Sequence, residues 1–166
     1  SLMRPPRAAA ETKAATSPKF PLVVRTAIPA DHKRILELWE ACGLTRPWND
    51  PRRDLERKLA HDPELLLVGT APAETTTANR VVATVMAGYE GHRGWQNYVA
   101  VDPALSGRGF GRAIVTEGER RLGALGCPKI NLQVRHDNMV AIGFWEALGY
   151  VVDDAVAMGR RLVPDN

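Results

Sequence analysis

Hydrophobic and polar positions in the first 60 residues switch between strand-like and helix-like spacing. Residues 20–26 form an apolar run typical of a strand, and Asp31 is the N-cap candidate of the helix that follows. That helix carries apolar residues at helical spacing and ends before a glycine. Asp50 followed by Pro51 predicts the start of a second helix over 51–60, because Pro suits the first helical position.

The next segment predicts three strands joined by turns. Residues 65–70 form a continuous apolar run typical of a buried strand, and residues 74–79 are polar and typical of a turn. Residues 81–89 and 96–102 lie on either side of a short glycine-rich stretch. We therefore expect these two segments to pair as a hairpin.

The last third of the chain predicts further helices and strands. A helix follows a glycine-rich loop and extends to about Leu125, where Gly-Cys-Pro ends it. Residues 129–135 alternate apolar and polar positions, as a half-buried strand does. Asp137 or Asn138 is the N-cap candidate of one more helix, which ends at a glycine.

Two short apolar segments, 150–152 and 155–162, complete the expected sheet. The element order β-α-α-β-β-β-α-β-α-β-β predicts an α/β fold of the α+β mixed-sheet type. We expect a central twisted mixed sheet of six or seven strands, flanked by about four helices, with one parallel crossover.

Charge is distributed unevenly along the 166 residues, whose formal net charge is +3. The first 19 residues carry this excess, as Arg4, Arg7, Lys13 and Lys19 against Glu11. Residues 20–166 carry 18 basic and 18 acidic side chains, so we expect no general attraction to nucleic acid. We interpret 1–19 as a flexible basic leader with a vector remnant at its start, and 20–166 as one domain.

Several classes of protein are disfavoured by what the chain lacks. No apolar run approaches the roughly 20 residues of a membrane helix, and the leader has no apolar stretch of a secretory signal. Cys42 and Cys127 are too few for a disulfide framework, and the four histidines lack metal-ligand spacing. We therefore expect a cytoplasmic protein with reduced cysteines, no metal and no membrane partner.

The motif Ser106-Gly-Arg-Gly-Phe-Gly111 lies between a predicted strand and a predicted helix. Glycines let backbone amides face a phosphate, and the helix N-terminus adds partial positive charge. A Walker loop is excluded because no Gly-Lys-Ser/Thr follows, and the third glycine lies one position too early for the dinucleotide fingerprint. Coenzyme A pyrophosphate is the remaining ligand.

Two longer segments, VAVDPALSGRGFGRAIV and NMVAIGFWEALGY, resemble the GNAT superfamily of acetyl-CoA-dependent N-acetyltransferases. The resemblance covers residues 22 to about 162. Within the family the chain resembles a YpeA-like subgroup of small bacterial acetyltransferases, through RPWND at 46–50, GYEGHRG at 88–94 and GCPKI at 126–130. The resemblance implies a GNAT-like fold with acetyl-CoA as cosubstrate.

The resemblance also implies roles for individual residues at the coenzyme. The backbone of Val99, Ala100 and Val101 would contact the pantetheine arm, and Asn138 and Trp145 would complete the site. The pyrophosphate would lie on the amides of Gly107, Arg108, Gly109, Phe110, Gly111 and Arg112. Ser106 stands where the family usually has Gln or Arg, which we expect to weaken phosphate binding without abolishing it.

Trp145 stands where many family members have a tyrosine that protonates the leaving thiolate. Its indole cannot serve as an acid, and an apolar wall is the alternative interpretation. A thiol pKa of about 8.5 makes expulsion of the thiolate at pH 7 unfavourable by only about 2 kcal/mol. Tyr150 or a water molecule could offset this amount.

The acceptor side is expected at the opposite end of the strand 96–102. Glu90 and His92 are the candidate general bases, and Arg93 could bind an acidic group of the substrate. Trp48 and Asn49 could form the other wall. The alternative interpretation is that the glycines around Glu90 shape a turn whose charges are solvated.

These observations predict transfer of an acetyl group from acetyl-CoA to a primary amine, by direct attack on the thioester. Backbone amides where the strand 96–102 diverges from 129–135 would stabilise the oxyanion. The partner would be a small-molecule or peptide amine, and the resemblance makes a homodimer possible. A catalytically inactive acyl-CoA-binding regulatory module is the alternative, and nucleotide binding at the glycine loop is a weaker one.

Overall fold

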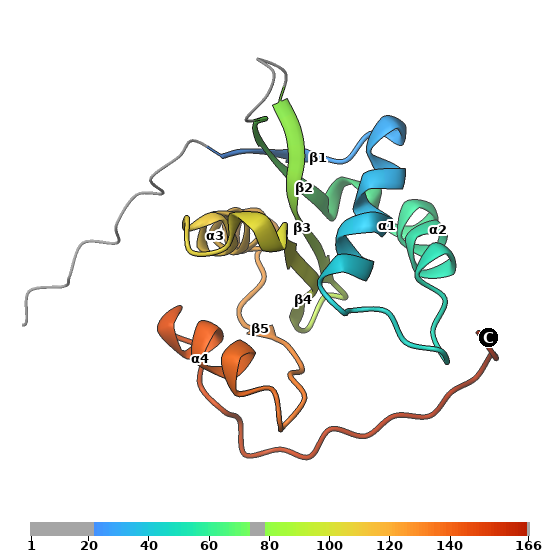
Figure 1. Cartoon of the computed structure of the whole chain (residues 1–166). Helices are drawn as coiled ribbons and strands as arrows, with labels where there is room; N and C mark the ends of the chain where they lie inside the picture. The colour runs from blue at the N-terminus through green and yellow to red at the C-terminus, as the bar shows by residue number, and fades with distance from the viewer. Residues whose placement is uncertain (1–21, 74–78, 166) are drawn as a thin grey trace, which may run out of the picture.

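The computed structural model describes residues 22–73 and 79–165, and these contain a five-stranded sheet in the order β1-β2-β3-β4-β5 (Figure 1). The first four strands are antiparallel neighbours, and β4 and β5 are parallel. The strands are β1 Val23–Thr26, β2 Leu66–Pro72, β3 Asn79–Tyr89, β4 Gly94–Val101 and β5 Ile130–Asn131. The mixed sheet with one parallel pair confirms the predicted GNAT-like fold class.

Helices cover both faces of this sheet. The α-helices are α1 His32–Ala41, α2 Pro51–His61, α3 Phe110–Ala124 and α4 Met139–Ala147, and the short 3-10 helices are η1 Pro29–Asp31, η2 Pro63–Leu65 and η3 Pro103–Leu105. On one face, Trp39 of α1 and Leu55 of α2 pack into a core cluster with strand residues. On the other face, Ile114 of α3 packs against Leu67 and Val85.

Side-chain caps start two of the helices where the sequence predicts them. The Asp50 carboxylate accepts a hydrogen bond from the Arg52 amide at 2.9 Å, and the Asn138 side chain accepts one from the Ala141 amide at 3.1 Å. Each bond satisfies an amide that has no partner within the helix. Asp31 differs, because its carboxylate binds Arg25 at 2.6 Å instead of an amide of α1.

The prediction for the C-terminal part of the sheet is wrong. The expected strand 129–135 is reduced to the two residues of β5, and the segments 150–152 and 155–162 form no strand. A two-residue β5 offers too short an edge for a further ladder. The apolar side chains of the segment, such as Val152 and Met158, are instead exposed. The described residues therefore hold five strands where six or seven were expected.

Three other groups of predictions concern the leader and a turn, membrane helices, and the cysteines. The basic leader 1–19 and most of the turn at 74–79 lie outside the described residues. In the part that the structure describes, no helix is both long and apolar enough to cross a membrane. Cys42 and Cys127 are both free, and each is half-buried.

Candidate functional site

The glycine loop leads directly into α3. Gly107 and Gly109 have φ values of +77° and +82°, in the left-handed region that favours glycine. Gly109 is the N-cap residue of α3, and Phe110, the first helical residue, is buried and fixes the end of the loop. A Cβ on Gly107 would meet nothing within 4 Å, so the loop surface is open there. The first amides of α3 have no partner within the helix and can hold an anion.

One edge of β4 continues from this loop. β5 pairs only with Gly94 and Trp95, so within the described residues the rest of this edge has no neighbouring strand. The Asp102 amide donates to Val82 O of β3 at 2.8 Å. Because amides alternate in direction along a strand, those of Val101 and Val99 face the opposite side, where β5 has ended. This edge can hydrogen-bond an extended ligand such as pantetheine.

A bulge interrupts β4 at its centre. The β3–β4 register shifts between Thr84 and Met86, and Tyr98 has φ +48°. Three contacts fix this backbone: Thr84 Oγ1 donates to Tyr98 O at 3.0 Å, Trp39 Nε1 donates to Thr84 Oγ1 at 3.1 Å, and the rings of Trp39 and Tyr98 stack with centroids 3.9 Å apart. A left-handed non-glycine residue costs on the order of 1–3 kcal/mol and is frequent at functional sites.

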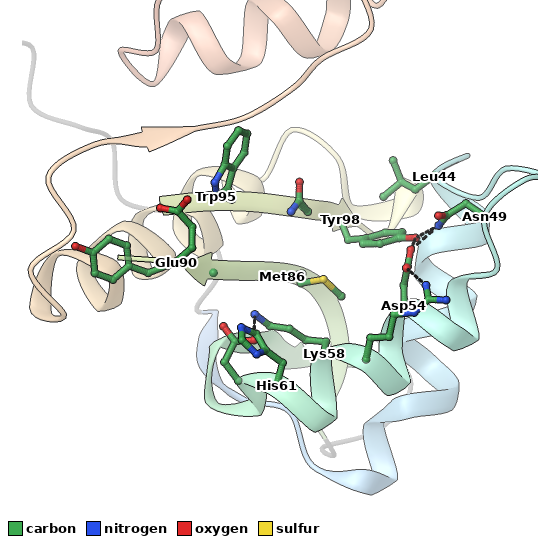
Figure 2. A pocket seen from close by; sticks show the side chains of 14 residues that line it. Leu44, Asn49, Asp54, Lys58, His61, Met86, Glu90, Trp95 and Tyr98 are labelled. Carbon is green, nitrogen blue, oxygen red and sulfur yellow. Dashed lines mark hydrogen bonds and ion pairs between the residues drawn. The ribbon is translucent and has the colours of Figure 1, made fainter. Parts of the chain in front are cut away.

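A cleft of about 700 Å³ lies between α2 and the strands β3 and β4. Figure 2 shows Glu90 and Trp95 toward one end of this cleft, Asn49, Asp54 and Tyr98 at the other, and Lys58, Met86 and His61 between them. The cleft and the open edge therefore meet at β4, the cleft on the face covered by α1 and α2.

A polar network occupies the Tyr98 end of the cleft. The Tyr98 hydroxyl donates to Asp54 Oδ2 at 2.6 Å and accepts from Asn49 Nδ2 at 3.1 Å, and Asn49 also donates to Asp54 (Figure 2). Burial and the Asp54 carboxylate raise the pKa of Tyr98 above its ordinary value. Tyr98 therefore stays protonated at neutral pH and acts as a donor.

Glu90 lines the cleft from the turn between β3 and β4. Its Oε1 accepts hydrogen bonds from the backbone amides of Arg93 and His92, the latter at 2.7 Å. These amides lower the pKa of Glu90, so it is ionised at neutral pH. His92 and Arg93 do not line the cleft, and the Arg93 guanidinium donates to His92 O at 2.9 Å.

Tyr150 lies away from Glu90, on the other face of β4. Its hydroxyl accepts a hydrogen bond from Gln96 Nε2 at 3.2 Å, and Gln96 packs against Gly118 of α3. Its ring makes an edge contact with Trp145 at a centroid distance of 4.9 Å. Burial, with Glu119 nearby, raises the pKa of Tyr150 to about 12.

The remaining predicted residues surround these features. Trp145 is buried in α4. Asn138 uses its side-chain oxygen for the α4 cap. Arg112 donates to Ala147 O at 3.3 Å, which ties α3 to α4. Trp48 is 53% exposed, with the Arg135 guanidinium 5.9 Å from its ring centroid, and it lines a separate hollow of about 450 Å³.

The cleft thus brings together Glu90 and Asn49 of the predicted set, while Tyr150, His92, Arg93 and Trp48 lie outside it. Sequence reasoning missed Asp54, Tyr98 and Lys58, which line the cleft. The periodicity of the predicted helix that contains Asp54 could have identified this residue from the sequence. No local signal in the sequence marks the bulge at Tyr98. Among the described residues, no group of three or more His, Cys, Asp or Glu side chains could hold a metal ion.

Comparison with known proteins gives a consistent result. Residues 33–150 match the model of the acetyltransferase (GNAT) family. An acetyltransferase of Yersinia enterocolitica is 47% identical over 142 residues, which cover 86% of this chain and 96% of that protein.

Two solved structures share the fold at lower identity. The NatC complex bound to Gag peptide and CoA is 16% identical, with TM-score 0.66 over 78% of this chain and 84% of that chain. An aminoglycoside 6'-N-acetyltransferase of Acinetobacter haemolyticus is 18% identical, with TM-score 0.64 over 85% of this chain and 99% of that chain.

Proposed function

The chain belongs to the GNAT family of acetyltransferases, and from this premise we propose that it transfers the acetyl group of acetyl-CoA to a primary amine by direct attack on the thioester. The observation that carries the proposal is the arrangement along β4. An open strand edge continues into a left-handed glycine loop, and a cleft lined by ionisable side chains opens on one face of the same strand. One strand can therefore place a thioester beside an amine.

The coenzyme half of the site uses mainly backbone groups. The amides of residues 107–112 would hold the pyrophosphate, with Arg108 and Arg112 adding positive charge. The amides of Val99 and Val101 would bind the pantetheine arm along the open edge. Asn138 and Trp145 would border the coenzyme from α4. Coenzyme A supplies the acetyl group as a thioester.

The acceptor half lies in the cleft. Glu90 is the candidate base, acting through water, because it is ionised and lines the cleft. As the amine nitrogen forms its bond to the carbonyl carbon, negative charge develops on the carbonyl oxygen, and backbone amides at the β4 bulge stabilise it. Tyr98 and Asn49, at the bulge end of the cleft, would orient the acceptor.

Collapse of the intermediate breaks the carbon–sulfur bond and leaves a thiolate. Tyr150 is the candidate acid, because its hydroxyl is protonated at neutral pH and can donate a hydrogen bond to the thiolate. Its hydroxyl accepts from Gln96 and keeps its own hydrogen available to donate. Trp145 packs against the ring and limits its orientations. His92 would act from the turn only through solvent.

A thiol-release assay over amino acids, short peptides, polyamines and aminoglycosides tests the proposal, together with calorimetry of acetyl-CoA binding. We expect micromolar acetyl-CoA binding and turnover on at least one amine class. Tight binding without turnover on any amine would favour the alternative, a catalytically inactive acyl-CoA-binding regulatory module. Competition by ATP but not by coenzyme A would instead favour nucleotide binding.

A further inference from the structure

The C-terminal segment crosses the molecule as an exposed strap. It leaves α4 and runs around the outside to end on the side of α1 and α2 (Figure 1). Val151, Val156 and Leu162 are all more than 80% exposed, whereas Asp165 is only 2% exposed. The strap is therefore attached mainly at two points, by Lys129 to Asp153 at its start and by Asp165 at its end.

The contacts of the Asp165 carboxylate are those that a bound carboxylate ligand would make. Arg57 approaches its carboxylate with both terminal nitrogens, Nη2 to Oδ1 at 2.6 Å and Nη1 to Oδ2 at 3.2 Å. Arg53 Nη1 lies 3.5 Å from Oδ1, and the backbone amide of Asp50, at the start of α2, donates to Oδ2 at 3.2 Å. Arg53 also donates to Pro164 O at 3.4 Å. Two guanidinium groups and a backbone amide are a donor set that fits a carboxylate.

This carboxylate site adjoins the acceptor cleft. Arg57 lines the cleft, and its Nη1 also donates to Asp54 Oδ1 at 3.1 Å. Asp54 in turn accepts from Tyr98 at the β4 bulge. A single chain of polar contacts thus connects the tail to the point where the thioester would lie. The hollow of about 450 Å³ between Trp48 and residues 161–165 lies beside the same carboxylate.

We propose that Arg57, Arg53 and the Asp50 amide form the recognition site for a carboxylate of the acceptor, and that Asp165 occupies it when no acceptor is bound. The acceptor is then an amine that also carries a carboxylate, such as an amino acid or a short peptide with a free C-terminus. The inference rests on the proposed function, since it names the substrate class of that site. The strap is displaced when the acceptor binds.

The exposed strap makes this exchange feasible. Displacing it breaks contacts of Asp165 and Pro164 and leaves no apolar core exposed, because the strap side chains are already exposed. Asp165 competes with the acceptor at the effective concentration of a short tether, on the order of millimolar. The tail therefore raises the KM of carboxylate-bearing acceptors and not that of other amines.

The test uses the full chain and peptides in two forms, with a free C-terminal carboxylate and with a C-terminal amide. Wild type is expected to acetylate the free acids with the higher kcat/KM, and Arg57→Gln to lose this preference. Asp165→Asn should lower the KM of the free acids by at least about threefold, because it removes a competing carboxylate that is buried between two half-exposed arginines. Asp153→Asn, which removes the ion pair at the other end of the strap, is the matched control and should leave KM unchanged.

A second measurement does not depend on turnover. Trypsin can cut the exposed strap after Arg160 or Arg161, and cleavage should accelerate in Asp165→Asn and when millimolar free-acid peptide is added to wild type. Turnover with equal kcat/KM for acids and amides would overturn the inference and leave the proposed function intact. Absence of turnover on every amine would count against the proposed function, and the trypsin result would then decide on the carboxylate site alone.

Discussion

Gly107→Ala tests whether the left-handed glycine loop binds the coenzyme. Gly107 has φ +77°, and an added Cβ would meet nothing within 4 Å, so the substitution creates backbone strain without a clash. A left-handed alanine costs about 1–2 kcal/mol. The loop of the variant is expected to relax to negative φ and to return to the left-handed form only when the coenzyme binds. The apparent affinity for acetyl-CoA should therefore fall about 5- to 30-fold.

Gly126→Ala is the matched control for this loop. Gly126 follows the C-terminus of the same helix, has φ +87°, and would also place its Cβ in open space. Gly126→Ala keeps its strain in the folded protein and should lower Tm by roughly 2–8 °C, whereas Gly107→Ala, whose loop relaxes, should lower Tm by less. Only Gly107→Ala should change the interaction with acetyl-CoA.

The assay is steady-state thiol release with acetyl-CoA as the varied substrate, supported by calorimetry on the free enzyme. The KM for acetyl-CoA should rise in Gly107→Ala and stay at the wild-type value in Gly126→Ala. A smaller loss of Tm in Gly107→Ala than in Gly126→Ala, together with an unchanged KM for acetyl-CoA, would refute the loop assignment, because the loop would then have relaxed without any effect on coenzyme binding.

Three further substitutions test the candidate base, the candidate acid and a buried ion pair of the cleft. Glu90→Gln keeps an oxygen that can accept from the turn amides but removes the negative charge, so kcat at neutral pH should fall by about 100-fold or more. An unchanged kcat from pH 6 to 9 would exclude Glu90 as the base. Tyr150→Phe should lower kcat by roughly 30-fold with the KM for acetyl-CoA unchanged, the factor that corresponds to about 2 kcal/mol of thiolate protonation. Because the pKa of Tyr150 is about 12, wild-type kcat should not fall through loss of this acid as pH rises to 10. An unchanged kcat in Tyr150→Phe would contradict the assignment. Lys58→Met removes the buried ammonium group that lies 2.7 Å from the Asp62 carboxylate, and it should lower the free energy of unfolding by about 3 kcal/mol in urea denaturation. Lys33→Met is the control, because Lys33 forms an exposed ion pair with Glu37 whose loss should cost under about 1 kcal/mol.

The parts of the fold that the sequence predicted are those fixed by local interactions. Asp50 and Asn138 cap helices through amides three or fewer residues away, so the sequence identifies Asp50 and narrows the second cap to Asp137 or Asn138. The left-handed glycines at 107 and 109 likewise follow from the need for φ values that other residues avoid. Each of these features depends on a few consecutive residues, which is why sequence reasoning finds them.

The bulge at Tyr98 could not be predicted, because its causes are distant in the chain. Trp39 stacks on its ring, Thr84 binds its carbonyl, and Asp54 accepts from its hydroxyl. Nothing in the sequence around residue 98 distinguishes it from an ordinary strand. Tyr98, at one end of the cleft, was therefore among the residues that sequence reasoning missed.

The C-terminal segment is a second case in which local sequence is insufficient, because here the local pattern predicts strands that do not form. Its short apolar runs predict strands, but a strand also needs an edge to pair with, and β5 provides only Ile130 and Asn131. The edge of β4 beyond Trp95 remains open in consequence. Had the predicted strand 129–135 paired along its whole length, it would have closed the edge that the proposed coenzyme site requires. The short β5 is thus a condition for the proposed function, and it also explains why the tail is available to reach Arg57.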